Sequence, residues 1–287
     1  LRLKNFTTIN PENKMPFSDI NLKDCYAYGK EKIGWKNRPS TPGTLKENGW
    51  LIGYGMANGV FGAGKGSASV RAILNKEGKL TLECAVSDMG PGTTTSMTKI
   101  AAAAMQMPIE KIKFKLGDSD LPPGPSQGGS GTTSTVGSAV DLACSTLKQN
   151  LKDLAIKLAP AFANLKSDAL DVKNEMVLAI ADPNIKITIV DLLQLSPDKQ
   201  IDLTIASSGK TAEQLKFTSN SFSSHYVKVA VNPKDGTIKI LQVVTTGDAG
   251  KIISPKTARS QMIGGVVGGI GMALTEQLEM DHVSGQI

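Results

Sequence analysis

The sequence predicts an α+β fold of mixed sheets with packed helices, and three observations indicate this class. Strand-like alternation on both sides of the Lys76-Glu77-Gly78 turn indicates a hairpin over 67–88. Apolar residues at three- and four-residue intervals predict helices over 93–107 and 135–158. A hairpin, a glycine-rich loop and a helix recur after residue 225. We therefore expect two similar hairpin–loop–helix units.

Residues 1–50 are predicted to be a lead-in segment. They contain a short amphipathic helix from about Asn21 to Trp35, followed by a polar stretch rich in proline and glycine. The compact domain is then expected over 51–287. Because the chain begins with Leu1 and not with methionine, we expect it to come from the middle of a longer product.

A smaller lobe is expected around 160–222 within this domain. Its predicted elements are two strands and a short helix, near 175–180, 201–206 and 190–195. A second hairpin follows over 226–245, with its turn at 232–236. The last helix is predicted to begin at Ser254-Pro255, because serine favours the N-cap and proline the first helical position.

Composition limits the classes of partner. The chain has 287 residues, of which 40% are hydrophobic and 20% charged, so it can bury one large or two ordinary cores. A net charge of +6 suits a phosphate-bearing ligand, a membrane surface or nucleic acid. The basic residues are scattered and aromatic residues make up only 5%, so nucleic-acid binding is not expected. The longest apolar run, Met262–Leu274, is too short to span a membrane.

No metal-ligating residue is predicted. Cys25, Cys84 and Cys144 are far apart in the sequence. They form neither a CxxC pair nor a cluster with His225 and His282. Zinc or an iron–sulfur cluster ligated by this chain is therefore not expected.

The strongest candidate site is the long loop over 117–133, which leads into the helix predicted over 135–158. Free N–H groups, the helix dipole and hydroxyl side chains at such a position favour a phosphate or pyrophosphate. The alternative is an ordinary capped loop, since serine and threonine are also common N-caps. A loop of this length inside a compact region is uncommon unless it binds something, which favours the site.

A second loop, Gly90-Pro91-Gly92-Thr93, repeats this arrangement on a smaller scale. It lacks the lysine of a phosphate-binding P-loop and the spacing of a dinucleotide fingerprint, so a nucleoside triphosphate is not expected. Asp88 and Asp248 each precede a glycine loop and are expected to orient it, a mainly structural role. Asp118 and Asp120 are interpreted as turn formers.

One side of the last predicted helix carries no side chains, because glycines occur there mostly three or four residues apart. They are Gly264, Gly265, Gly268, Gly269 and Gly271. Each glycine costs about 1 kcal/mol relative to alanine in a helix interior, so the pattern indicates that something approaches the backbone closely. Tight helix packing is the usual reason, and a cofactor lying against that face is the alternative.

The run Gly-Asp-Ser-Asp-Leu-Pro-Pro-Gly-Pro at 117–125, continued by Gly128-Gly129-Ser130 and Thr135-Val136-Gly137, resembles a known family. It is similar to the molybdopterin-binding subunit of bacterial aldehyde oxidoreductases, in the xanthine dehydrogenase/aldehyde oxidase family. Further segments of the chain resemble that subunit in the same order, at 1–5, 16–18, 50–57, 88–93 and 248–261.

The resemblance implies a molybdenum cofactor-binding domain that is incomplete at its C-terminus. It implies molybdopterin, plain or in the cytosine dinucleotide form, whose dithiolene sulfurs hold the metal in place of protein ligands. It also implies that both glycine loops and the glycine-rich helix line the pterin and its tail. The cofactor-binding candidates are Gly90, Pro91, Gly92, Thr93, Ser130, Thr132, Thr133, Ser134, Thr135, Gly137 and Gly268.

The implied activity is hydroxylation of a small aldehyde or N-heterocycle with oxygen from water, with a glutamate as general base. Iron–sulfur and flavin subunits are the implied partners that receive the electrons. The family's catalytic glutamate lies in a Gly-Glu loop that we expect beyond Ile287, and Glu276 and Glu279 do not match it. No catalytic residue is therefore assigned, and the fragment alone is expected to be inactive.

Two departures from the family pattern leave alternatives open. Pro91 stands where relatives often have glutamine, which removes a hydrogen-bonding contact near the metal, and Ala249 stands where cysteine is common. One alternative is a non-catalytic scaffold that has lost the cofactor, which Pro91 would allow. The other is a serine-type, amidase-like hydrolase, because Gly128-Gly129-Ser130 resembles the glycine–serine loops of such enzymes.

Overall fold

The computed structural model describes residues 1–287, which form two compact units. The first unit combines 1–62 with 216–287, and the second comprises 63–215. The division differs from the predicted one, because the first fifty residues pack with the end of the chain. Both units contain helices and strands, which confirms the α+β class.

A four-stranded antiparallel sheet forms the centre of the first unit, in the order β1-β2-β10-β11. The strands are β1 (Lys46–Glu47), β2 (Trp50–Gly62), β10 (Asn220–Val231) and β11 (Ile238–Asp248). The predicted second hairpin is confirmed, and both of its strands are longer than expected. β10 also pairs with β2 along its whole length, so segments about 170 positions apart in the sequence share a ladder.

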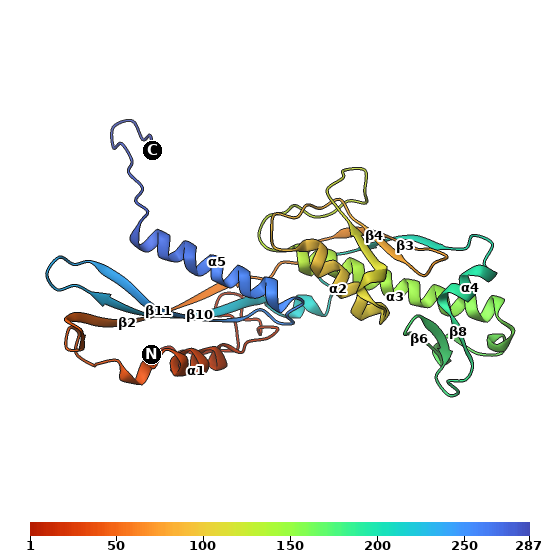
Figure 1. The fold of residues 1–287 in the computed structure, drawn as a ribbon, viewed down its shortest axis with the longest axis horizontal. Helices are drawn as coiled ribbons and strands as arrows, with labels where there is room; N and C mark the ends of the chain where they lie inside the picture. The colour runs from red at the N-terminus through yellow and green to blue at the C-terminus, as the bar shows by residue number, and fades with distance from the viewer. The chain divides into compact units, whose positions relative to one another are not determined.

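Helix α1 (Leu22–Lys32) covers one face of this sheet (Figure 1). Its buried side includes Cys25 and Tyr26, and Gly29 lies directly against the sheet. A Cβ added at Gly29 would lie 2.4 Å from Cε2 of Tyr226, so only glycine fits this contact. The predicted lead-in helix therefore exists and is part of the core of the first unit.

Helix α5 (Pro255–Leu274) lies over the opposite face (Figure 1), with Met262 above Gly247 of β11. It begins at the predicted position, but none of its residues is buried. A Cβ added at Gly264, Gly265, Gly268 or Gly269 would meet nothing within 4 Å. The close approach that these glycines predict is not made within the first unit.

The second unit has a sheet in the order β5-β4-β3-β9. The strands are β3 (Ala68–Leu74), β4 (Leu80–Glu83), β5 (Ile112–Lys115) and β9 (Ile201–Ser207). The β3–β4 hairpin is confirmed, and β5 joins β4 in parallel. β9 pairs with β3 and does not join the smaller lobe, because Leu203 and Ile205 extend the apolar face of β3.

Helices α2 (Thr93–Met105) and α3 (Thr132–Leu158) pack together, and α3 lies on β3 and β9. The predicted apolar stripe of α3 is buried along most of its length, from Val136 to Ala155. α2 matches its prediction, whereas α3 begins three residues before Thr135. Hydroxyl residues that favour N-caps form its first turn here, which is why the pattern placed the start too late.

A small lobe packs on α3 with helix α4 (Ile189–Leu195). Its three-stranded antiparallel sheet comprises β6 (Leu170–Lys173), β7 (Met176–Ala179) and β8 (Lys186–Thr188). Thr188 caps α4 by accepting a hydrogen bond from the Asp191 N–H at 3.0 Å. None of the five α-helices has both the length and the apolar character that crossing a membrane requires.

Candidate functional site

Two helices of the second unit begin after a glycine, so the N-cap residue has no side chain that could bind the first N–H groups. Gly92 precedes α2 and Gly131 precedes α3. The first turn of a helix has no helical acceptors for its N–H groups and lies at the positive end of the dipole. A Cβ added at Gly137, near the start of α3, would lie 2.6 Å from Cδ1 of Ile100 and 3.9 Å from Cε of Met97. The first two turns of α3 therefore pack against the middle of α2.

Asp88 organises the loop before α2. Its Oδ1 accepts hydrogen bonds from the N–H groups of Gly90 at 3.0 Å and Gly92 at 3.2 Å. Both glycines have positive φ, +110° and +86°, which side-chain-bearing residues rarely adopt. Burial disfavours the Asp88 carboxylate, but hydrogen bonds from these amides and those of Thr93 and Thr94 outweigh it and lower its pKa. Asp88 thus orients its glycine loop.

The hydroxyls early in α3 fix a neighbouring segment of backbone. Ser134 Oγ donates to the carbonyl of Gly64 at 2.5 Å and to that of Gly131 at 2.9 Å. Thr135 Oγ1 is buried and accepts from the N–H of Gly66 at 3.0 Å. These two side chains are therefore already engaged within the second unit, whereas the hydroxyl of Thr133 lies on an exposed residue.

Gln127 contributes a polar atom that sequence reasoning missed. Its Oε1 accepts from Thr132 Oγ1 at 3.3 Å, beside the first turn of α3. Its Nε2 is buried and has no hydrogen-bond partner. A buried donor without an acceptor costs about 1–3 kcal/mol, so such atoms usually await a ligand, an ion or water. The only sequence signal was an amide side chain in a loop of otherwise small residues and prolines.

An open cavity of about 640 Å³ lies between the end of β4 and the long loop. This volume is within the range of about 300–1,000 Å³ typical of ligand pockets. Backbone and small side chains form most of its walls, and Asp118 is the one charged residue among them. Its lining runs from Ser87, which precedes Asp88, to Gln127. The cavity therefore borders both glycine loops.

The structure divides the predicted site residues into three groups. Those of 90–93 lie at the start of α2, and those of 130–135 lie at the start of α3. Gly137 is buried against α2, where its lack of a side chain serves helix packing. Gly268 lies on α5, in the first unit.

The cysteines lie in the interior and not at this site. Burial raises the pKa of Cys84 to about 11 and that of Cys144 to about 12, and it also raises the pKa of Cys25. Cys84 and Cys144 belong to the core of the second unit. No group of three or more histidines, cysteines and acidic residues is placed to hold a metal ion.

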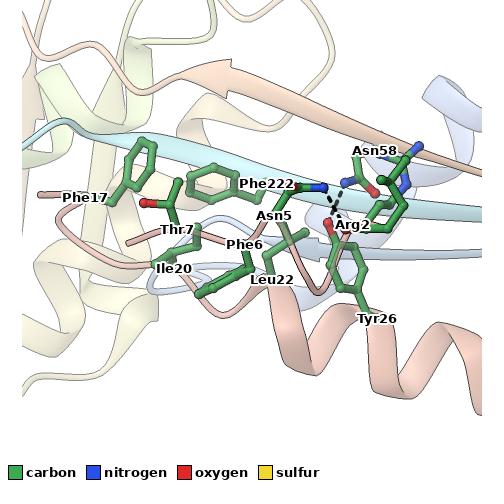
Figure 2. Close-up of a pocket in the computed structure, with 11 residues that line it drawn as sticks. Arg2, Asn5, Phe6, Thr7, Phe17, Ile20, Leu22, Tyr26, Asn58 and Phe222 are labelled. Carbon is green, nitrogen blue, oxygen red and sulfur yellow. Dashed lines mark hydrogen bonds between the residues drawn. The ribbon is translucent and has the colours of Figure 1, made fainter. Parts of the chain in front are cut away.

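A second cavity, of about 380 Å³, lies in the first unit beside α1 (Figure 2). Its walls are mainly aromatic and aliphatic, and Phe17 and Phe222 meet edge to face at 5.2 Å between centroids. Of its polar groups, the Tyr26 hydroxyl and the Asn58 amide hydrogen-bond to each other at 2.5 Å. Arg2 is the one charged residue in the lining.

The serine-hydrolase alternative is not supported by the surroundings of Ser130. Ser130 makes no hydrogen bond to a basic side chain, and its φ is +58°. A serine–histidine pair does occur at Ser223 and His225, with 2.8 Å between Oγ and Nε2. Both residues lie on β10, whose backbone pairs with β2 on one side and β11 on the other. The ladder therefore uses the N–H groups that an oxyanion hole would need.

Comparison with known proteins identifies the class. The chain matches the family described as the molybdopterin cofactor-binding domain over residues 28–287, and it belongs to that family. Several of its relatives are described as molybdenum-binding subunits. It is 30% identical to the aldehyde oxidoreductase molybdenum-binding subunit PaoC of Escherichia coli K12 over 284 residues, which are 98% of this chain and 36% of that protein. It is 23% identical to the xanthine dehydrogenase molybdenum-binding subunit of Escherichia coli O157:H7, covering 100% of this chain and 39% of that one.

Solved structures share the fold. Quinoline 2-oxidoreductase from Pseudomonas putida 86 superposes with a TM-score of 0.83 at 16% identity, covering 99% of this chain and 38% of that chain. The Cu,Mo-CO dehydrogenase gives 0.79 at 17% identity, covering 98% and 38%. The chain thus spans somewhat more than a third of the length of these relatives.

Proposed function

We propose that this chain is the cofactor-binding part of a molybdenum hydroxylase that oxidises aldehydes or N-heterocycles with water as the oxygen source. The observation that carries the proposal is the start of α3 in the second unit. The start of α3 combines uncapped backbone N–H groups with the buried, unpartnered Nε2 of Gln127. A set of donors without a basic side chain or a metal-ligand cluster fits an anionic cofactor that carries its own metal ligands.

The residues of this chain hold and orient the cofactor. The first-turn N–H groups of α3 and the exposed Thr133 hydroxyl would bind phosphate oxygens. The exposed backbone of Gly90 to Gly92 would lie against the pterin, because it has no side chain except Pro91 to keep a planar ring away. When bound, the molybdenum pterin supplies two-electron redox chemistry.

The cytosine dinucleotide form is proposed because the start of α3 and the long loop before it offer more contacts than one terminal phosphate needs. Aldehydes are the favoured substrate class, since the relative that is 30% identical is an aldehyde oxidoreductase subunit. N-heterocycles are the alternative class, because quinoline and nicotine oxidising enzymes are also among its relatives. Iron–sulfur and flavin subunits are the proposed partners. We also propose that residues 1–287 alone do not turn over substrate.

The test uses the full-length protein that contains this chain. Purified protein is expected to hold equimolar molybdenum, measured by mass spectrometry of the metal, and pterin, measured by fluorescence after oxidation. It is expected to oxidise aldehydes with an artificial electron acceptor. The absence of both metal and pterin would favour the scaffold alternative. Turnover by residues 1–287 comparable to that of the full-length protein would overturn the proposed inactivity of the fragment.

A further inference from the structure

The two helix starts differ in what already occupies them. At α2, the chain supplies its own anion, because Asp88 Oδ1 accepts from the N–H groups of Gly90 and Gly92. At α3, Gly131 has no side chain to accept from the first turn. The acid nearest in sequence before it, Asp120, is eleven positions away, and the side chain of Asp118 is engaged by the N–H of Asp120 at 2.9 Å. No carboxylate is therefore bonded to the start of α3.

A carboxylate in the α2 loop has two physical consequences. It satisfies amides that would otherwise bind a ligand anion, and it repels a second negative charge at short range. It also favours one shape of the loop, because it joins the N–H groups of Gly90 and Gly92 to a common acceptor. Asp88 thus makes the backbone of this loop rigid while it removes the loop's affinity for anions.

We propose that Asp88 is a resident anion that closes the start of α2 to phosphate and thereby directs the cofactor's phosphate to the start of α3. This inference rests on the proposed function, and it assigns different tasks to two loops that look alike in sequence. Asp88 is a positioning residue: it shapes the loop against which the pterin lies. The phosphate oxygens accept hydrogen bonds from the first-turn N–H groups of α3. They also accept from Nε2 of Gln127, whose side chain lies beside Thr132 and has no other acceptor for this atom.

The experiment counts anion sites on cofactor-free full-length protein by calorimetric titration with inorganic pyrophosphate. The wild type is expected to bind at one site. Asp88→Ala frees the amides of the α2 loop, so a second pyrophosphate is expected to bind. Asp120→Ala is the matched control, because it removes the same charge from an exposed loop of the same unit, and it is expected to leave one site.

Gln127→Met tests the other half of the proposal. Loss of a hydrogen bond to a charged ligand is expected to weaken pyrophosphate binding by about tenfold or more. The same substitution is expected to leave the melting temperature of the cofactor-free protein close to that of the wild type, because removing a buried donor without an acceptor offsets the loss of the hydrogen bond from Thr132 Oγ1. Gln194→Met, at an exposed position of α4, is the control and is expected to keep wild-type affinity.

Chemical rescue distinguishes a resident anion from a merely structural aspartate. Formate or phosphate is expected to restore the melting temperature of Asp88→Ala in a concentration-dependent manner and to have no such effect on Asp120→Ala. If Asp88→Ala fails to fold, Asp88→Asn, which keeps an acceptor oxygen without the charge, is expected to bind the second pyrophosphate weakly. An unchanged number of sites in the foldable variant, or an unchanged affinity in Gln127→Met, would overturn the proposal. Because the metal and pterin content of the wild type is measured separately, that outcome leaves the proposed function standing.

Discussion

Gly124 offers a sharp test of how the long loop is held on the second unit. A Cβ added there would lie 2.3 Å from Cγ1 of Val86 and 3.0 Å from both the carbonyl oxygen of Ala85 and the Sγ of Cys84. The first of these distances is too short for any real contact between carbon atoms, and the Ala85 carbonyl is backbone that cannot rotate away. Gly124→Ala must therefore push the loop away from residues 84–86, which follow β4.

The cost follows from what the displacement breaks. The loop is joined to the sheet by two backbone hydrogen bonds, from the N–H of Ala85 to the carbonyl of Pro122 at 2.7 Å and from Ser69 to Pro123 at 2.9 Å. Overpacking a well-packed site costs about 1–3 kcal/mol, and each weakened hydrogen bond adds up to about 1 kcal/mol. We expect Gly124→Ala to lower the free energy of unfolding by about 2–4 kcal/mol. For a unit of this size, each kcal/mol corresponds to a decrease of about 2–4 °C in melting temperature.

The matched control is Gly128→Ala, four positions along the same loop. A Cβ there would meet only Ser126 Oγ, at an ordinary 3.8 Å. This variant is expected to be neutral, or to gain up to about 1 kcal/mol by restricting the unfolded chain. Thermal unfolding followed by circular dichroism measures both variants. Equal melting temperatures for the two would refute the reasoning, because they would show that the contact at Gly124 carries no penalty.

Two further predictions concern charge and the last helix. Hydrogen bonding by Arg71 lowers the pKa of Asp202 below its ordinary value of 3.8, so the pair stabilises the fold above that pH, and this contribution is lost as the pH falls through the lowered pKa. Asp202→Asn is therefore expected to flatten the dependence of the melting temperature on pH below about 4. Parallel curves for the wild type and the variant would contradict this expectation. A Cβ at Gly264 would meet open space, so Gly264→Ala is expected to stabilise residues 1–287 by about 1 kcal/mol. The same substitution is expected to destabilise a full-length protein in which another segment packs against α5. Urea unfolding of both forms measures the two effects.

Local patterns in the sequence were enough for most elements. The periodicity of apolar residues predicts α3 because its stripe has to be buried along most of the helix. The alternation around Gly78 predicts the β3–β4 hairpin for the same reason. Asp88 could be predicted as an orienting residue, because the amides that it binds are two and four positions away. Each of these features depends on neighbours in the chain, which the sequence contains directly.

Contacts between distant segments could not be predicted in this way. Pairing of β10 with β2 makes the lead-in segment part of a core, although the two strands are separated by the whole second unit. β9 pairs with β3 over more than 120 positions of sequence, which removed it from the predicted lobe. Pairing of this kind depends on which apolar faces meet, and periodicity describes only one face at a time.

The sequence by itself determined the order of the elements, the two glycine loops and the resemblance to molybdopterin-binding subunits. Only the tertiary structure decided which donors of those loops remain free. The N–H groups near Gly90 are satisfied by Asp88, the Thr135 hydroxyl is used by Gly66, and the Nε2 of Gln127 has no partner. The physical reason is that a hydrogen bond needs a partner about 3 Å away, and composition does not say which atoms come that close.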